Sequence, residues 1–315
     1  MRRLITRRLL LIVPTLWLVS VLIFVMAEIV PGDLGRKILG PYASNEQVAA
    51  LNHELGVDKP LLERYVFWLG DFVTGDWGTS PILQQPVSNV TFEALRDSAL
   101  LAGLALVIIV PASLVLGVLA ALKRDSLLDR FITVSSLSLT VIPEFVSGVI
   151  LLVLFAVLIK AFPVTAAAPE GAGIGTRLYY LILPAIPLMF VELGYIARMA
   201  RAGTLEVLDM PYVRTAYLKG MPRRKVVTRH VLRNALLPTV TVIGAQIGWL
   251  VGGLVVVETL FNYPGIGKLM ADSARLHDIR VLEATVLVVA AIYMLSNLLA
   301  DVVVALLNPR VRLGG

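Results

Sequence analysis

Two glutamates lie deep within apolar stretches of the chain, where an ionisable side chain is costly and points to a function. Glu192 lies in the apolar segment Leu178–Ala197, and Glu144 lies in the preceding one. Each carboxylate could face a hydrated path through the apolar layer and meet a cationic group of a solute there. Each could equally pair with an arginine such as Arg198, or with a residue of a partner chain. These two glutamates, together with Gln246, are our candidates for residues that line a translocation path.

Four other acidic residues lie nearer the ends of apolar segments: Glu28, Glu258, Glu283 and Asp301. Water or lipid headgroups can reach side chains at such positions, so these carboxylates need no functional explanation. We expect each of them to be solvated.

Residues for covalent or metal chemistry are scarce. The chain has no cysteine, which excludes disulfides, thiolate catalysis and cysteine-ligated metals. The three histidines fall in three separate segments: His53, His230 and His277. Serines occur within the apolar stretches, but no histidine lies there to activate one. No G-x-x-x-x-G-K-[ST] phosphate-binding loop occurs, and residues 265–268 lack its spacing. The chain is therefore not expected to be an enzyme, to bind a metal or to hydrolyse ATP.

The elements that must hold these residues are long and apolar. Hydrophobic residues make up 57% of the chain and charged residues 16%, with a mean hydropathy of +0.83. This composition exceeds the apolar content of a soluble domain. Six stretches approach or exceed the roughly 20 residues that a bilayer-crossing helix needs: Leu9–Val30, Ala99–Leu122, Phe131–Ile159, Leu178–Ala197, Ala235–Val257 and Val281–Leu307. The sequence therefore predicts an all-α polytopic membrane protein with six transmembrane helices.

The placement of lysine and arginine predicts the orientation, because cytoplasmic loops carry an excess of both. With the N-terminus inside, cytoplasmic segments hold eighteen of the 28 basic residues, nine of them between Arg198 and Arg233. Segment 31–97 instead carries nine acidic and five basic residues. Both termini are therefore expected in the cytoplasm. Topology accounts for the net charge of +6 without a nucleic-acid partner.

Three regions follow from this layout. Residues 1–30 form the cytoplasmic N-terminus and first transmembrane helix, and residues 98–315 form a five-helix core. Residues 31–97 form a small helical cap outside the cytoplasm. Aromatic residues of this cap could pack on one another or lie at the membrane interface as a belt. They could instead receive a substrate-delivering protein. These residues are Tyr65, Phe67, Trp68, Phe72 and Trp77.

A stripe of glycines marks the fifth apolar stretch. Gly244, Gly248 and Gly252 recur every four residues, which places them on one face of a helix. A smooth face allows close approach of another helix, within the chain or on a partner. Helix packing is the expected role, and a pore-lining role is the alternative.

A basic stretch from Arg198 to Arg233 separates the fourth and fifth apolar segments. Asp209 and Pro211 are typical of a helix start, because a carboxylate caps free backbone N–H groups and proline tolerates the first turn. Gly220 fits a helix stop, since glycine adopts the left-handed conformation at little cost. A second basic helix is expected to follow and to run to Pro238. The stretch, with its end at residue 238, is thus predicted to be an organised cytoplasmic loop.

The spacing of Arg214-Thr215-Ala216, Gly220 and Leu237-Pro238 resembles the EAA loop of ABC-importer permeases. Other short motifs, in order, resemble the B-type subunit of the dipeptide/oligopeptide/nickel permease family. They are Arg7-Arg8-Leu9-Leu10, Val30-Pro31-Gly32-Asp33, Leu55-Gly56-Val57-Asp58-Lys59-Pro60, Gly75-Asp76-Trp77-Gly78-Thr79-Ser80, Val257-Glu258-Thr259-Leu260-Phe261, Tyr263-Pro264-Gly265-Ile266-Gly267 and Asn308-Pro309-Arg310-Val311-Arg312. The resemblance covers nearly the whole chain.

This resemblance implies a type I ABC-importer permease fold and a coupling helix at 206–220, within the cytoplasmic loop 198–238. In the family such a helix docks into a cleft on the ATP-hydrolysing subunit. The residues expected at that contact are Tyr212, Arg214, Thr215, Ala216, Leu218 and Gly220. The alternative is a basic loop that touches anionic lipid headgroups.

The resemblance also implies the partners. They are a second homologous permease chain, two ATP-binding subunits and an extracytoplasmic substrate-binding protein, assembled in the bilayer of a bacterial inner membrane. ATP and Mg²⁺ would bind the partner ATPases, and this chain would hold no cofactor of its own.

The sequence departs from the family pattern at three places. Arg214 replaces the acidic residue of the general EAA motif, so docking through that carboxylate cannot be carried over. Residues 95–98 read Leu-Arg-Asp-Ser where a proline-bearing turn is expected. Glu192 stands where a small or apolar residue is more usual. These departures bear on the cargo more than on the class.

A small peptide is the expected cargo, and a nickel chelate, an opine or a glutathione-like compound are alternatives within the class. Two other classes compete. A secondary transporter driven by an ion gradient would show inverted repeats, and none is evident. A membrane protease or lipid-modifying enzyme would need a nucleophile and base near a span.

Overall fold

The computed structural model describes residues 2–29, 36, 39–40, 42–54 and 59–307. Throughout these ranges the regular elements are helices, and a single isolated bridge joins Thr79 and Pro86. The helices, including two π-helical segments (η1 and η2), are α1 (Arg2–Ile29), α3 (Asn45–Glu54), α4 (Leu61–Thr74), α5 (Val87–Leu122), α6 (Leu127–Val141), α7 (Glu144–Leu151), η1 (Leu152–Leu158), α8 (Ile174–Leu208), α9 (Pro211–Leu218), α10 (Arg223–Val226), η2 (Val227–Val231), α11 (Leu232–Ala235), α12 (Leu237–Leu260), α13 (Ile266–Leu276) and α14 (Ile279–Leu307). The motifs at 30–33 and 308–312, and most of the one at 55–60, lie outside the described residues.

Four helices are each long and apolar enough to cross a membrane: Arg8–Ala27, Val87–Leu122, Ile174–Leu208 and Ile279–Val303. The count rises to six if each of two bent helix pairs is one span. The fifth predicted span corresponds to one such pair, bent by 48° between Leu237–Leu250 and Gly252–Leu260. The all-α polytopic class is therefore confirmed.

The third predicted span, 131–159, is not one straight helix. α6 and the helix formed by α7 and η1 meet at an angle of 101°. Pro143 explains the break, because proline disfavours the helical conformation of the residue before it. Ile142 is accordingly extended, with φ −78° and ψ 119°.

Two helices run further than their apolar content predicts. α5 begins at Val87, so Leu95–Ser98 lies inside a continuous helix and not in a turn. α8 continues past Ala197 to Leu208. The first third of the basic stretch is thus an extension of the fourth apolar helix.

The chain divides into two compact units. The first comprises residues 1–8, 96–268 and 292–315, and the second comprises residues 9–95 and 269–291. By these ranges, α5 and α14 each contribute residues to both units.

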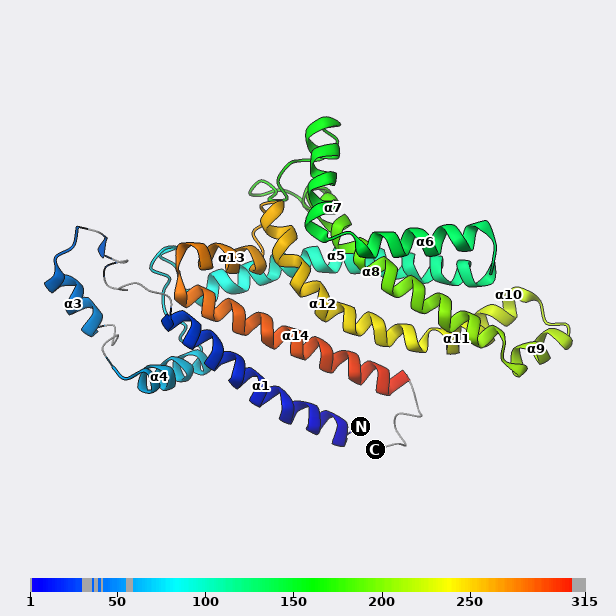
Figure 1. Cartoon of the computed structure of the whole chain (residues 1–315), viewed down its shortest axis with the longest axis horizontal. Helices are drawn as coiled ribbons and strands as arrows, with labels where there is room; N and C mark the ends of the chain where they lie inside the picture. The colour runs from blue at the N-terminus through cyan, green and yellow to red at the C-terminus, as the bar shows by residue number, and fades with distance from the viewer. Residues whose placement is uncertain (1, 30–35, 37–38, 41, 55–58, 308–315) are drawn as a thin grey trace. The chain divides into compact units, whose positions relative to one another are not determined.

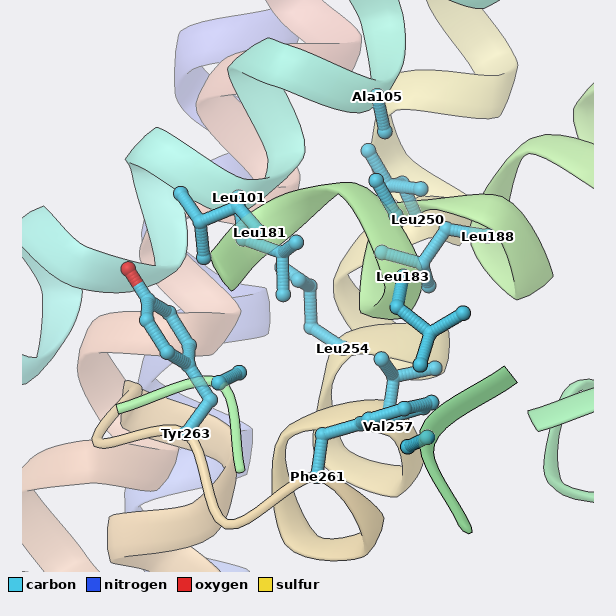
Figure 2. Packing of buried hydrophobic residues seen from close by; sticks show 13 residues of the cluster. Leu101, Ala105, Leu181, Leu183, Leu188, Leu250, Leu254, Val257, Phe261 and Tyr263 are labelled. Carbon is cyan, nitrogen blue, oxygen red and sulfur yellow. The ribbon is translucent and has the colours of Figure 1, made fainter. Parts of the chain in front are cut away.

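The core of the first unit gathers side chains from α5, α8 and α12. Leu101, Leu183 and Val257 are at most 1% exposed, and Leu254 and Phe261 lie beside them (Figure 2). Lipid tails are as apolar as leucine, so burial from water does not hold such helices together. Close packing does, because each buried side chain gains many dispersion contacts.

A chain of aromatic rings organises the second unit. Ring contacts with centroids 4.8 to 6.0 Å apart link Phe24 of α1, Tyr65, Trp68 and Phe72 of α4, then Trp77, and Trp77 lies 5.4 Å from Phe92 of α5. The indole Nε1 of Trp77 donates to the carbonyl of Phe72 at 2.9 Å. Four of the five cap aromatics therefore pack on one another. Phe67 is instead 57% exposed, with the Lys59 ammonium 4.9 Å from its ring centre.

Candidate functional site

The predicted coupling helix is divided in two. α8 ends at Leu208, Met210 is extended with ψ 141°, and α9 begins at Pro211. Asp209 makes no side-chain cap for α9, whose N-cap residue is Met210. The predicted helix start at Pro211 is confirmed, but Asp209 does not cap it, and the predicted coupling helix 206–220 is not one continuous helix. Pro211 is the reason, because it forces the preceding residue out of the helical region.

The predicted helix stop at Gly220 is confirmed. Gly220 has φ +74°, and its N–H donates to the carbonyl of Tyr217 at 2.9 Å. A side chain is strained in this left-handed conformation, so glycine suits the position. The basic helix that follows is less regular than predicted. α10 passes into the π-helical turn η2 and then α11, and α12 begins only after Leu236.

A small apolar cluster holds α9 in place. Val213 and Ala216, three residues apart on α9, are 0% and 6% exposed. They pack with Val226 of α10, Val231 of η2 and Ala235 of α11. Figure 1 shows α9 and α10 beyond the carboxyl end of α8. A helix of eight residues is unstable alone, so this cluster is what fixes it.

The opposite face of α9 carries exposed side chains. Arg214, Thr215 and Leu218 lie away from the two buried positions, and Leu218 is 80% exposed. We name these three residues the outer face of α9. These three side chains are therefore available, at the end of the loop, for contact with another molecule.

Two tyrosines flank the outer face. The hydroxyl of Tyr212 accepts a hydrogen bond from Asn234 Nδ2 at 3.0 Å, which ties α9 to α11. Tyr217 is 40% exposed. Tyr217 and Asn234 were missed in the sequence, although Tyr217 could have been found from its place one residue before Leu218 on the same short helix.

The loop also contacts the turn between α5 and α6. Arg223 Nη2 donates to the carbonyl of Leu122 at 2.9 Å, and Arg124 lies 3.8 Å from the Asp209 carboxylate. The first contact joins α10 to the end of α5, and the second joins the residue after α8 to the turn that follows α5.

A bidentate ion pair lies just behind that turn. Arg201 Nε and Nη2 donate to the two carboxylate oxygens of Asp129 at 2.6 and 2.7 Å. The Asp129 side chain is 3% exposed and that of Arg201 27%. Asp129 lies in the first turn of α6, where its N–H donates to Ser126 Oγ at 3.2 Å. Sequence reasoning missed this pair, although the Ser-x-x-Asp spacing is a helix-start signature.

The three path candidates lie together although they come from three helices. Glu192 of α8 is 1% exposed, and its carboxylate interacts with Gln246 of α12 and with the charge of Glu144, which begins α7. A Cβ added to Gly253 would lie 3.6 Å from Glu144 Oε1, which places α12 against this carboxylate as well.

Two atoms of this polar cluster lack hydrogen-bond partners in the described structure. They are Glu192 Oε2 and Gln246 Nε2, both buried. Neither glutamate forms an ion pair with Arg198 among the described residues, and Arg198 instead lies over the ring of Tyr195 at 5.4 Å. A buried carboxylate oxygen without a partner is costly.

Comparison with known proteins identifies the chain. Residues 113–313 match the family model "Binding-protein-dependent transport system inner membrane component", and residues 1–96 match the model of its N-terminal region. The chain belongs to this family. It is a non-catalytic membrane subunit of an ABC importer, and a multi-pass inner membrane protein.

Two relatives align with this permease from end to end. It is 34% identical over 308 residues to the "Probable peptide ABC transporter permease protein y4tP" of Sinorhizobium fredii, covering 98% of each chain. It is also 34% identical over 306 residues to the glutathione transport system permease protein GsiC of Escherichia coli, covering 97% of each.

Glu258 of the permease is buried, contrary to the expectation that it is solvated. It is 0% exposed, and it accepts hydrogen bonds from the N–H groups of Gly267 at 2.8 Å and Lys268 at 3.1 Å. Ser98 Oγ donates to its other carboxylate oxygen. The positive end of a helix favours a carboxylate, so Glu258 serves as a cap for α13.

The glycines of the Tyr263–Gly267 motif make room for this cap. A Cβ at Gly265 would overlap the Glu258 carboxylate, and one at Gly267 would lie 2.5 Å from the Cα of Val255. Tyr263 donates from its hydroxyl to the carbonyl of Asp97 at 2.8 Å. Burial, and then the Asp97 charge, raises the pKa of Tyr263 well above its usual range, which keeps this donor protonated.

The other acidic residues near the ends of the predicted spans differ in their exposure to solvent. Glu283 is 4% exposed, so it too is buried and not solvated. Asp301 is the partly solvated case, and its carboxylate pairs with Arg8 Nε at 2.9 Å. The side chain of Glu28 lies outside the described residues.

The three glycines of the predicted stripe on α12 do not all have the same surroundings. A Cβ at Gly244 would overlap Ala300 of α14, and one at Gly248 would lie 2.9 Å from the Tyr293 ring. Gly252 has no such neighbour within 4 Å in the described structure. Two of the three glycines thus pack against α14.

Proposed function

We propose that this permease forms half of the translocation path of an ATP-driven importer, and that α9 couples the path to an ATPase subunit. The outer face of α9 is the observation that carries the coupling role. Arg214, Thr215 and Leu218 are presented to solvent by a helix that is fixed on a buried cluster. Lipid headgroups would account for the basic charge of the loop, but they would not require a short helix fixed on a buried cluster.

The assembly follows from the class. A second permease chain would complete the path, two ATP-binding subunits would bind ATP and Mg²⁺, and a binding protein outside the cytoplasm would deliver the cargo. Lysine and arginine placement supports cytoplasmic termini and a position of α9 on the ATPase side of the membrane.

The contacts around the loop offer a route for movement. A displacement of α9 would reach α8 directly, because Asp209 and Met210 alone separate the two helices. It would reach α5 through Arg223 and Leu122. The Arg201–Asp129 pair would carry it from α8 to α6.

A di- or oligopeptide is the proposed cargo. The named relatives include a peptide permease and a glutathione permease, and both names fit small peptidic solutes. Within the path, the proposed contacts are Glu144, Glu192 and Gln246, and the carboxylates of the two glutamates would meet a cationic group of the cargo. Nickel chelates, opines and glutathione-like compounds remain alternatives within the class.

The test is to purify the chain from its native membrane in mild detergent and identify the proteins that accompany it. Recovery of a second permease, Walker-motif ATPases and a binding protein is expected. Uptake into proteoliposomes containing the assembly should then require ATP. A chain recovered alone, with uptake driven by an ion gradient and indifferent to ATP, would contradict the proposal. Family membership already argues against that ion-driven alternative.

A further inference from the structure

Helix α4 is attached to α1 by its aromatic face. Ser20 Oγ and the Tyr65 hydroxyl are 2.8 Å apart. The ring of Phe24 lies 5.4 Å from the rings of both Tyr65 and Trp68. Figure 1 shows the two helices in the same part of the molecule.

This attachment fixes the depth of α4. Ser20 and Phe24 belong to the apolar span Arg8–Ala27. At 1.5 Å per residue they lie about 10 and about 4.5 Å before its end. Because the hydrocarbon core of a bilayer is about 30 Å thick, both positions lie at the level of acyl chains in one leaflet. A helix that packs on them lies at that level too, and not above the headgroups.

The neighbouring face of α4 is apolar and uncovered. Leu62, Val66 and Val73 are 72%, 60% and 76% exposed, and their spacing places them on one side of the helix. We name these three residues the apolar stripe. No residue of α4 is buried. On α1 itself, Leu22 and Met26 are 53% and 64% exposed within the same span, so apolar side chains of α1 are also uncovered at this depth.

The remaining arc of α4 carries polar side chains together with the exposed ring of Phe67. Glu63, Asp71 and Thr74 are exposed there, and Lys59 pairs with Glu63 at 3.5 Å. A helix with a packed aromatic face, an apolar stripe and a polar arc has the pattern of one that lies in the plane of a membrane interface.

We propose that α4 lies in the leaflet at the carboxyl end of α1, with the apolar stripe in contact with acyl chains. With the proposed orientation, this is the outer leaflet. α4 is then an interfacial helix and not part of a water-exposed cap, and the stripe is not the surface on which a binding protein docks. The inference goes beyond the proposed function and requires only that α1 cross the bilayer.

The absence of cysteine makes a direct test possible, because each single-cysteine variant carries one spin label. The variants are Leu62→Cys, Val66→Cys and Val73→Cys in the stripe, with Glu63→Cys, Asp71→Cys and Thr74→Cys as controls on the same helix. Each would be placed in the assembled transporter in vesicles of phosphatidylethanolamine and phosphatidylglycerol. The measurement is the ratio of label collisions with oxygen, which partitions into lipid, to collisions with a water-soluble nickel chelate.

The stripe should show a ratio above one and the controls a ratio below one, which gives an alternation with helical period. Ratios below one at all six positions would place α4 in water and overturn the proposal. Stripe labels that are open to water, and become protected only when the purified binding protein is added, would assign the surface to that protein and overturn it as well. All six positions are exposed, so the substitutions leave the packed face intact.

Discussion

The Ser98 hydroxyl donates a hydrogen bond to the carboxylate of Glu258, and this contact ties the middle of α5 to the end of α12. Ser98 Oγ in turn accepts the N–H of Ile266 at 2.8 Å, the first residue of α13. One hydroxyl and one carboxylate therefore hold three helices at a point where a span ends. The family-like motifs at 257–261 and 263–267 thus act in the structure as the cap of α13 and the turn that leads into it.

Replacing Glu258 with alanine should destabilise the permease strongly. Three donors would be left buried without an acceptor, and each such group costs about 1–3 kcal/mol. Glu258→Gln should cost less, since its carbonyl oxygen still accepts. Thermal unfolding of the purified chain in detergent measures the effect. Glu93→Ala, an exposed glutamate of α5, is the control. Equal melting temperatures for Glu258→Ala and that control would remove the cap argument.

The sequence predicts the class, the glycine stop at 220 and the grouping of cap aromatics, because each depends on local composition or on one residue's backbone preference. It does not predict the burial of Glu258, since its partners are 160 positions away at Ser98 and in backbone N–H groups that carry no sequence signal. Likewise an apolar run cannot show that Pro143 turns a helix by 101°. The approach of Glu144, Glu192 and Gln246 depends on that turn and on tertiary packing.

Removing Arg201 and removing Asp129, which form an ion pair, should lower the free energy of unfolding by different amounts. Arg201→Ala leaves a carboxylate that is 3% exposed without its partner, and such a loss costs about 3–5 kcal/mol. Asp129→Ala leaves an arginine that is partly exposed and can be hydrated, so it should cost less. The double variant should be more stable than Arg201→Ala alone. A double-mutant cycle on unfolding measures the coupling, and strictly additive losses would contradict it.

The outer face of α9 and the cluster beneath it should respond differently to truncation. Leu218→Ala should lower transport-coupled ATP hydrolysis about tenfold, the effect of a contact worth about 1.4 kcal/mol, with the melting temperature unchanged. Val213→Ala opens a cavity and should lower stability by about 2 kcal/mol. ATPase assays in proteoliposomes, run beside thermal unfolding, separate the two. The exposed Leu127, on α6, supplies the matched control Leu127→Ala. If Leu218→Ala and Leu127→Ala hydrolyse ATP alike, the outer face is not the coupling contact.

Neutralising Glu144 should weaken recognition of a cargo ammonium. Glu144→Gln removes the charge and keeps the shape, and a hydrogen bond to a charged group is worth about 1.5–3 kcal/mol. The KM for a dipeptide with a free amino terminus should therefore rise about tenfold or more. Uptake of the same dipeptide with an acetylated amino terminus should not change between the variant and the parent. Glu170→Gln, an exposed glutamate before α8, is the control. If Glu144→Gln lowers the uptake of both dipeptides equally, the charge of Glu144 acts on packing or gating and not on the cargo.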